Sequence, residues 1–430
     1  MPGSQMYKAL ALYAHYFQNL EHISVEWDAP RKRLRYIPFS SGMLWLWMWN
    51  IFFVAGLGLF GMSYIGLIRT MISEQFVLPK FNIITTVMQM VLITFGIGVT
   101  LALIFYGEGF VNGWNRYIAR EMQINKDAST KTTPDFPGLA SKHFVKMFAM
   151  YPFILIPSSM LLQLDILYFF IEEFKTYLPI KYQTLFVVLS SVFIRLPTVS
   201  IGIIEICRLF PLLFILFTSC LQCCNNLLSR YLNELVEQRK LHQSLGGREL
   251  FPINGKFLMK SMSDYKQHVI IQSSIAPFQE CCTAILFAVG LVASIIFNTA
   301  TLRTYKVLPF FFYIYIPSVA VMTITMIGLM VPFAQTVNET SGKMMTEWKT
   351  RLNFKELWPK RALLKRMIRS IKPVSLYAGL FGFRFFYIQR STKVNFYATI
   401  MSYTTNAMVG TPQSILHEME KNRLSIYVKP

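Results

Sequence analysis

The sequence predicts an all-α polytopic membrane protein with seven transmembrane helices, and three observations support this fold class. Of the 430 residues, 53% are hydrophobic and only 15% are charged, whereas an average soluble chain carries roughly a quarter charged residues. The apolar residues form uncharged runs of about 20 residues or more, the length of a helix that spans a hydrocarbon core of about 30 Å. The basic residues lie mainly in the connectors between these runs. An ordinary soluble enzyme is therefore excluded.

Residues 1–42 precede the first apolar run and contain five Lys and Arg residues. They lack the uninterrupted apolar core of a cleavable signal peptide, so we expect them to form a cytoplasmic N-terminal segment. Four runs contain no charged residue and predict helices 1, 2, 5 and 6: 43–68, 81–107, 281–301 and 307–338.

Helices 3 and 4 are less regular in sequence. Residues 147–171 predict helix 3, with Asp165 near its outer end, where water reaches the carboxylate. The apolar stretch that follows is too long for one straight span and contains Pro197 and Pro211. We therefore expect helix 4 at 199–223, preceded by a cap or re-entrant piece at 183–198 over the outer face.

The last uncharged run, 394–416, predicts helix 7 and is rich in hydroxyl and amide side chains. Unpaired polar groups that face lipid cost free energy, so this helix should face protein or water. A ring of such helices from several subunits can replace part of an ion's hydration, while apolar side chains constrict the path. The candidate pore-lining residues are Thr399, Ser402, Thr405, Asn406, Met408 and Val409. The alternative is a polar helix buried inside one monomer.

The distribution of basic residues predicts the orientation, because cytoplasmic connectors carry the excess of Lys and Arg. Connectors on one side contain 28 such residues and those on the other side contain nine. Seven spans with a cytoplasmic N-terminus and an extracellular C-terminus fit this count. A G-protein-coupled receptor has the opposite orientation. Nucleic-acid binding is not expected despite the net charge of +20, because the basic residues form no compact domain.

The spans and connectors divide the chain into seven parts. They are a cytoplasmic N-terminal segment (1–42), helices 1–4 with a probable ligand pocket (43–223), a cytoplasmic stalk and loop (224–272), helices 5–6 (273–338), a cytoplasmic anchor region (339–390), pore-lining helix 7 (391–416) and an extracellular tail (417–430). Leucines at helical spacing in 225–243 indicate that helix 4 continues as the stalk, ended by Gly246 and Gly247. A basic helix at 348–371 either faces water and lipid headgroups or packs between subunits.

No catalytic or metal-binding motif is present, so we expect neither enzymatic activity nor a cofactor. The six cysteines lie in or beside apolar segments and are interpreted as buried or lipid-facing thiols, with palmitoylation of Cys220, Cys223 and Cys224 as a minor alternative. Glu205 and Arg208 are three residues apart in helix 4 and should pair on one face.

Aromatic residues near the outer face suggest a site for a small organic ligand. Most aromatic residues at such depths form interfacial belts, but a pocket between helices 2, 3, 4 and 6 is the alternative that would bind an apolar ligand. The candidate pocket residues are Tyr106, Tyr151, Tyr168, Phe311, Tyr313 and Tyr315.

The segments GFRFFYIQRST (382–392) and FYATIMSYTTNAM (396–408) resemble the C-terminal signature of the arthropod gustatory and odorant receptor superfamily. Ser402-Tyr403 stands where such receptors have Thr-Tyr, and Val409-Gly410 replaces their Gln-Phe. The predicted topology also resembles that of this superfamily, with seven spans, an internal N-terminus and a basic connector before the last helix.

The resemblance implies a tetrameric, ligand-gated, non-selective cation channel in the plasma membrane, homomeric or heteromeric, opened by a small tastant or odorant. It implies a split seventh helix, whose cytoplasmic half at 371–387 packs around the stalk, with Gly382, Arg390 and Tyr403 in gating or anchoring roles. The principal alternative is a secondary transporter with Glu205, Arg208 and Asp165 at its substrate site. A non-conducting scaffold protein is the third alternative.

Overall fold

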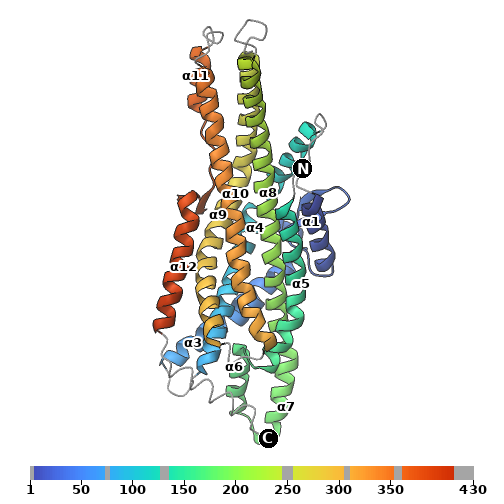
Figure 1. The fold of residues 1–430 in the computed structure, drawn as a ribbon. Helices are drawn as coiled ribbons and strands as arrows, with labels where there is room; N and C mark the ends of the chain where they lie inside the picture. Colours follow the sequence, from blue (N-terminus) through green and yellow to red (C-terminus); the bar gives the residue numbers. More distant parts are fainter. Residues whose placement is uncertain are drawn as a thin grey trace.

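Long helices account for most of the chain and run side by side in an elongated bundle (Figure 1). The computed structural model describes residues 4–72, 78–125, 135–244, 255–304, 310–352 and 361–410. The N-terminal part contains α1 (Ser4–Phe17), β1 (Val25–Asp28), β2 (Arg33–Tyr36), η1 (Phe39–Ser41), α2 (Trp45–Trp49), η2 (Asn50–Gly61), α3 (Met62–Ile72) and α4 (Lys80–Asn125). The middle part contains α5 (Phe136–Leu161), α6 (Ile166–Lys175), α7 (Ile180–Ser190), η3 (Ser191–Arg195) and α8 (Leu196–Ser244). The C-terminal part contains α9 (Gly255–Thr304), α10 (Phe310–Arg351), α11 (Arg361–Ser370), β3 (Tyr377–Leu380), β4 (Phe383–Tyr387) and α12 (Arg390–Gly410).

Six helical segments in the described residues are long and apolar enough to cross a membrane. They are Trp45–Ile72, Asn82–Gln123, Phe136–Lys175, Ile180–Lys240, Lys256–Arg303 and Tyr313–Arg351. The prediction of a helical, multi-pass membrane protein is therefore confirmed for six spans. The seventh predicted helix is present as α12, which has 21 residues, but its hydroxyl and amide side chains leave it outside this apolar set.

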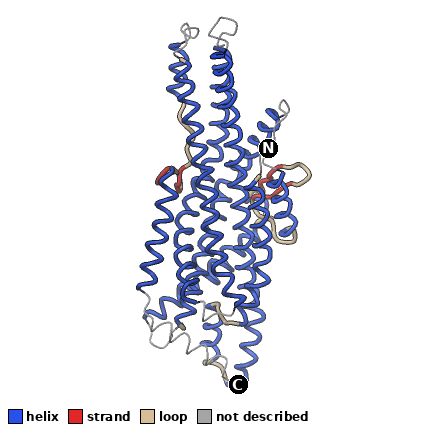
Figure 2. The backbone as a smooth tube through the Cα atoms, in the orientation of Figure 1, coloured by secondary structure: helices blue, strands red, loops and turns tan. Residues whose placement is uncertain are grey.

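The all-α prediction missed two short antiparallel hairpins, β1–β2 and β3–β4. They lie on opposite flanks of the bundle in the view of Figure 2. The segment 371–387 consists of an irregular stretch at 371–376 followed by the β3–β4 hairpin, so the predicted helical half there is wrong. Phe381 and Gly382 adopt positive φ angles of 50° and 86° at its turn, and the aromatic sequence of β4 favours a strand over a helix.

Helix α8 is the central helix of the bundle. Every residue from 207 to 221 is buried, as expected for a segment that is mostly apolar on all sides. The helix continues through Pro211, because neighbouring helices enclose the point where one backbone hydrogen bond is lost.

Helix 4 is longer than predicted, and no re-entrant cap precedes it. Segments α7, η3 and α8 form one continuous helical run from Ile180 to Lys240. The π-helical segment η3 directly precedes Pro197, and a widened turn accommodates the backbone where proline lacks a donor and crowds the preceding turn.

Helix 3 also differs at its outer end. Helix α5 ends at Leu161, and Asp165 lies after it, as the N-cap of α6. The Asp165 carboxylate accepts a hydrogen bond from the Tyr168 backbone N–H at 3.1 Å, which satisfies one of the unpaired donors at a helix start.

Helix α8 continues to Ser244 beside α9 and α10, as the leucine spacing in 225–243 predicted. Trp348 packs edge-on against Tyr265 at 5.2 Å between ring centroids, and its indole N–H donates to Ser261 at 3.3 Å. Arg239 pairs with Glu347 at 3.1 Å. Gly246 and Gly247 lie outside the described residues, as does the tail 417–430. The basic helix expected at 348–371 is represented by the end of α10 and by α11, whose Leu364 and Ile368 are buried.

Candidate functional site

Helix α12 packs on the outside of its own bundle, against α9 and α10 (Figure 1). Its inner face is formed by Phe396, Ile400 and Thr404, which are buried and spaced four residues apart. Phe396 contacts Phe287 edge-on at 5.2 Å between ring centroids. The Tyr397 hydroxyl donates to the Ile324 carbonyl of α10 at 3.1 Å.

The opposite face of α12 is exposed and carries both polar side chains and apolar ones such as Met401 and Val409. Among the predicted pore-lining residues, Ser402, Thr405, Asn406 and Val409 are exposed, whereas Thr399 and Met408 lie half-buried. The alternative of a polar helix buried inside one monomer is therefore wrong. Five exposed positions, 395, 402, 405, 406 and 409, fall on one side of the helix, because 3.6 residues complete a turn.

Two threonine hydroxyls of α12 donate hydrogen bonds to backbone carbonyls of the same helix, whereas two other polar side chains make no hydrogen bond in the described part of the chain. Thr399 donates to the Asn395 carbonyl at 2.7 Å, and Thr405 donates to the Met401 carbonyl at 2.9 Å. Within the described part of the chain, the side chains of Ser402 and Asn406 have no hydrogen-bond partner. This face therefore retains donors and acceptors for water, ions or another subunit.

The N-terminal end of α12 is hydrogen-bonded to α10. Arg390 forms two hydrogen bonds with the Glu339 carboxylate, at 2.7 and 3.0 Å, and the Gln335 amide donates to the Gln389 carbonyl at 2.8 Å. Arg390 therefore links the start of α12 to α10, and its anchoring role stays a prediction. Gly382 lies at the hairpin turn before α12, and Tyr403 is exposed on the side of α12 rather than in a contact that restrains it.

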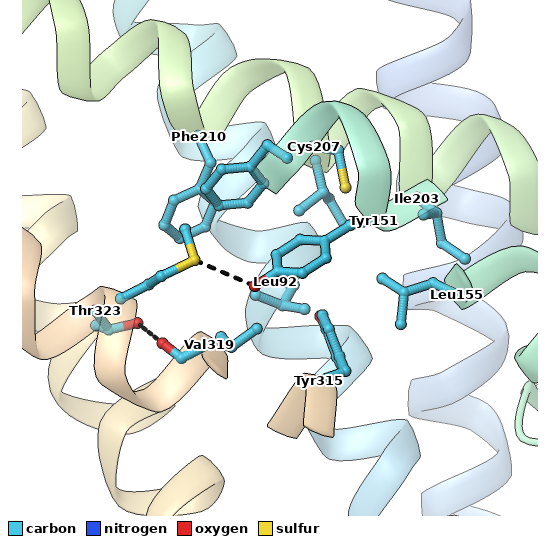
Figure 3. Close-up of a pocket in the computed structure, with 12 residues that line it drawn as sticks. Leu92, Tyr151, Leu155, Ile203, Cys207, Phe210, Tyr315, Val319 and Thr323 are labelled. Atoms are coloured by element: carbon cyan, nitrogen blue, oxygen red, sulfur yellow. Dashed lines mark hydrogen bonds between the residues drawn. The ribbon is translucent and has the colours of Figure 1, made fainter. Parts of the chain in front are cut away.

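A small apolar cavity lies between α4, α5, α8 and α10 (Figure 3). It has a volume of about 40 Å³ and adjoins a second cavity of about 100 Å³, with which it shares residues such as Leu92, Ile203 and Tyr315. Sequence reasoning predicted a pocket between these four helices. We refer to the two adjoining spaces as the central pocket.

The structure brings only two of the six predicted pocket residues into the central pocket. Tyr151 and Tyr315 line it and pack edge-on at 5.4 Å between ring centroids. Tyr106 and Tyr168 lie elsewhere, and the Tyr313 hydroxyl donates to the Thr301 carbonyl. The side chain of Phe311 lies outside the described residues. Aromatic content alone did not distinguish these positions, because the face that each residue presents depends on helix rotation.

The pocket offers few polar atoms. The Tyr151 hydroxyl donates to Ser318 at 2.8 Å and lies 3.3 Å from the Met322 sulfur, and Figure 3 shows it pointing into the space beside Tyr315. Thr323 is bonded to its own helix, through the Val319 carbonyl at 2.9 Å. Such a lining suits a small, mainly apolar molecule with one hydrogen-bonding group.

Other lining residues were missed, although a signal was present. Ile203, Ile206, Cys207 and Phe210 lie on one face of α8 and all contact the cavity. Their spacing of three and four residues marks one helix face, but an apolar face on a central helix is indistinguishable in sequence from ordinary core.

Four of the buried charged residues, Asp165, Arg195, Glu205 and Arg208, form two separate ion pairs. Glu205 pairs with Arg208 at 3.4 Å and accepts a hydrogen bond from the Trp47 indole at 3.1 Å. Asp165 pairs with Arg195 at 2.7 Å. The predicted Glu205–Arg208 pair is therefore present, but Asp165 belongs to another cluster, so the three charges do not share one substrate site.

The six cysteines are all buried, including Cys220, Cys223 and Cys224. Palmitoylation of these three thiols would require the bundle to open. In the described residues, no group of three or more His, Cys, Asp and Glu side chains has the arrangement of a metal site.

Comparison with known proteins adds no functional assignment. No protein-family model matches the chain, and no curated protein matches it.

Proposed function

We propose that this protein is a chemosensory receptor that acts as a ligand-gated, non-selective cation channel in the plasma membrane. The observation that carries the proposal is the exposed polar face of α12, with Ser402, Thr405 and Asn406 turned away from their own bundle. Copies of the chain assemble around an axis, as a tetramer, and each copy contributes α12 as a seventh span to the ion path.

The energetic argument concerns what the polar face of α12 contacts. In a lone protomer embedded in lipid, the Asn406 amide would face acyl chains, and each unsatisfied polar group there costs several kcal/mol by order of magnitude. In a ring of copies, the same amides and hydroxyls line water and replace part of an ion's hydration shell. The exposed apolar side chain of Val409 constricts the path one turn beyond Thr405.

The central pocket supplies the ligand site, and α10 connects it to α12. Thr323 of α10 lines the pocket, and the carbonyl of the next residue, Ile324, accepts the Tyr397 hydroxyl of α12. A small molecule that binds more tightly when α10 holds its open-state position shifts the population toward the open channel. In the resting state, the pocket has room only for compact ligands, such as small esters, ketones or amines.

Oxidative cross-linking tests the assembly. A Val409→Cys variant should form disulfide-linked dimers of the full chain, because a pore axis brings equivalent α12 positions within the roughly 7 Å Cα separation that a disulfide requires. The native thiols are all buried and give little background. The measurement is non-reducing electrophoresis after mild oxidation of membranes, combined with the mass of the purified oligomer.

Val188→Cys is the matched control for this experiment. Val188 is also an exposed valine, but it lies on α7, so its variant should remain uncross-linked. Absence of the Val409→Cys dimer, or a purified protein that is strictly monomeric, would contradict the proposed channel.

Removal of one hydroxyl tests the ligand site. Tyr151→Phe should raise the half-maximal concentration of an agonist, found by screening small organic compounds, about fivefold, because one hydrogen bond contributes about 1 kcal/mol. Tyr313→Phe removes a hydroxyl that bonds the Thr301 backbone instead and should leave the dose–response curve in place. The same shift in both variants would argue against a ligand contact at Tyr151.

A further inference from the structure

The β1–β2 hairpin is fastened to α4 by specific contacts. The Asn115 side chain accepts from the Leu34 backbone N–H at 3.0 Å and donates to the Leu34 carbonyl at 2.9 Å. Trp27 of β1 packs edge-on against Trp114 at 5.9 Å between ring centroids. The amide of Asn115 thus pairs with β2 as a neighbouring strand would, and it holds the hairpin in a fixed position.

A polar cavity of about 440 Å³ lies between this hairpin and α4. Its walls include Arg33, Arg35, Tyr36, Glu108, Asn112 and Asn115. Arg33 and Arg35 lie on the same face of β2, because alternate strand residues point the same way, and Leu34 between them is buried. We refer to this space as the hairpin cavity.

The arginines of the hairpin cavity have weak protein partners or none. Arg33 is 3.8 Å from Asp28, the limit of an ion pair. Among the described residues, Arg35 has no ion-pair partner. Burial, together with the negative charge of Glu108, raises the pKa of Tyr36, so its hydroxyl stays protonated. It donates to the Ile104 carbonyl at 3.3 Å.

The hairpin cavity lies where the protein leaves the apolar layer. Glu108 is the first charged residue after the uncharged run of α4, which places it at a boundary between lipid and water. Pro38 also lines the cavity, and the chain continues from it into exposed Phe39, Met43 and Trp45. A charged cavity therefore adjoins an apolar surface with the aromatic content of a membrane interface.

We propose that the hairpin cavity binds the headgroup of an anionic glycerophospholipid. The lipid phosphate lies between Arg33 and Arg35, which donate charge-assisted hydrogen bonds. Glu108 and the Asn112 amide, on the α4 wall, accept hydrogen bonds from a headgroup hydroxyl or ammonium, as in phosphatidylinositol or phosphatidylserine. The acyl chains pass over the exposed side chains of Phe39, Met43 and Trp45. The carboxylate of Glu108 repels inorganic phosphate more strongly than a lipid phosphodiester, because inorganic phosphate carries more negative charge. Inorganic phosphate also has no ammonium group that could bind this carboxylate.

Lipid titration of the purified full chain tests this site. The probes are fluorescent short-chain phosphatidylserine, phosphatidylinositol and phosphatidylcholine in non-ionic detergent at 0.15 M salt, where exposed charges more than about 8 Å apart are largely screened. The double variant Arg33→Gln/Arg35→Gln should weaken binding of the two anionic lipids about 25-fold, since each arginine near a headgroup contributes roughly a fivefold factor. Phosphatidylcholine should bind weakly to both proteins.

Arg31→Gln/Lys32→Gln is the matched control, because it removes the same charge from the turn of the same hairpin but not from the cavity wall. It should weaken anionic-lipid binding less than threefold. The single variant Arg35→Ala removes no ion pair among the described residues and should weaken anionic-lipid binding about fivefold. It provides a second test in case the double variant does not fold. Thermal unfolding of each variant checks that the fold is retained.

Three outcomes would overturn the proposal. Equal losses in the two double variants would mean that the hairpin attracts lipid by charge alone, without a built site. Unchanged binding in Arg33→Gln/Arg35→Gln would place the lipid elsewhere. Complete displacement of the lipid probes by millimolar inorganic phosphate would identify a free-phosphate site instead.

Discussion

Replacing Thr405 with leucine is expected to lower the cation current of the assembled protein about tenfold or more at unchanged surface expression. Thr405 is exposed on the polar face of α12, where its hydroxyl oxygen would contact a permeating cation. Hydrogen-bond-strength contacts to charged groups contribute about 1.5–3 kcal/mol, and about 1.4 kcal/mol corresponds to a factor of ten in rate. The measurement is whole-cell current at a saturating dose of agonist, or basal current if no agonist is known.

Thr94→Leu is the matched control for this variant. Thr94 is also an exposed threonine whose hydroxyl bonds the carbonyl four residues earlier, at 2.8 Å compared with 2.9 Å for Thr405. It lies on α4 instead of α12, so its replacement changes the same local hydrogen bond outside the proposed ion path. Equal currents in both variants would remove α12 from the conduction pathway.

Replacing Glu205 with leucine is expected to reduce the stability of the protein by about 3–5 kcal/mol, because it leaves the Arg208 guanidinium buried without its carboxylate. The side chains of the pair are only 3% and 4% exposed, so water cannot take over that role. The measurement is the unfolding temperature of the detergent-purified protein, followed by tryptophan fluorescence. Trp47, which donates to Glu205, is a reporter inside the affected cluster.

Glu172→Leu is the control for the Glu205 variant. Glu172 pairs with Lys175 at the same spacing of three residues, but both side chains are about one-third exposed, so its loss should cost less than about 1 kcal/mol. The double variant Glu205→Leu/Arg208→Leu should recover much of the lost stability, since no buried charge is left unpaired. A stable Glu205→Leu protein that has lost uptake of a solute would instead favour the transporter alternative.

The membrane spans could be predicted from sequence because the signal is local. The uncharged run 43–68 largely overlaps the observed apolar span Trp45–Ile72, and 281–301 falls inside Lys256–Arg303. The leucine spacing after 225 correctly extended α8. The ends of helices 3 and 4 could not be predicted equally well. They depend on Asp165 capping α6 and on a π-helical turn before Pro197, features that composition over a window does not reveal.

The candidate sites were predictable to different degrees. The polar character of α12 is visible in the sequence, but the side on which it packs is set by Phe396 and Ile400 meeting α9 and α10. The central pocket was placed between the correct helices with only Tyr151 and Tyr315 correct. The β1–β2 hairpin was missed because it depends on Asn115, 81 residues away in sequence from Leu34.

Helix α8 is long enough to connect the central pocket with a distant contact to α10. From Ile203 in the central pocket to Leu235, whose carbonyl accepts from Arg351 of α10, the helix rises roughly 48 Å at 1.5 Å per residue. Pro211 interrupts its backbone ladder between those two points and provides a natural flexure. If the central pocket binds a ligand as proposed, a tilt of α8 at Ile203 is expected to displace Glu234 by a larger distance, and a fluorophore attached near Glu234 would report the binding.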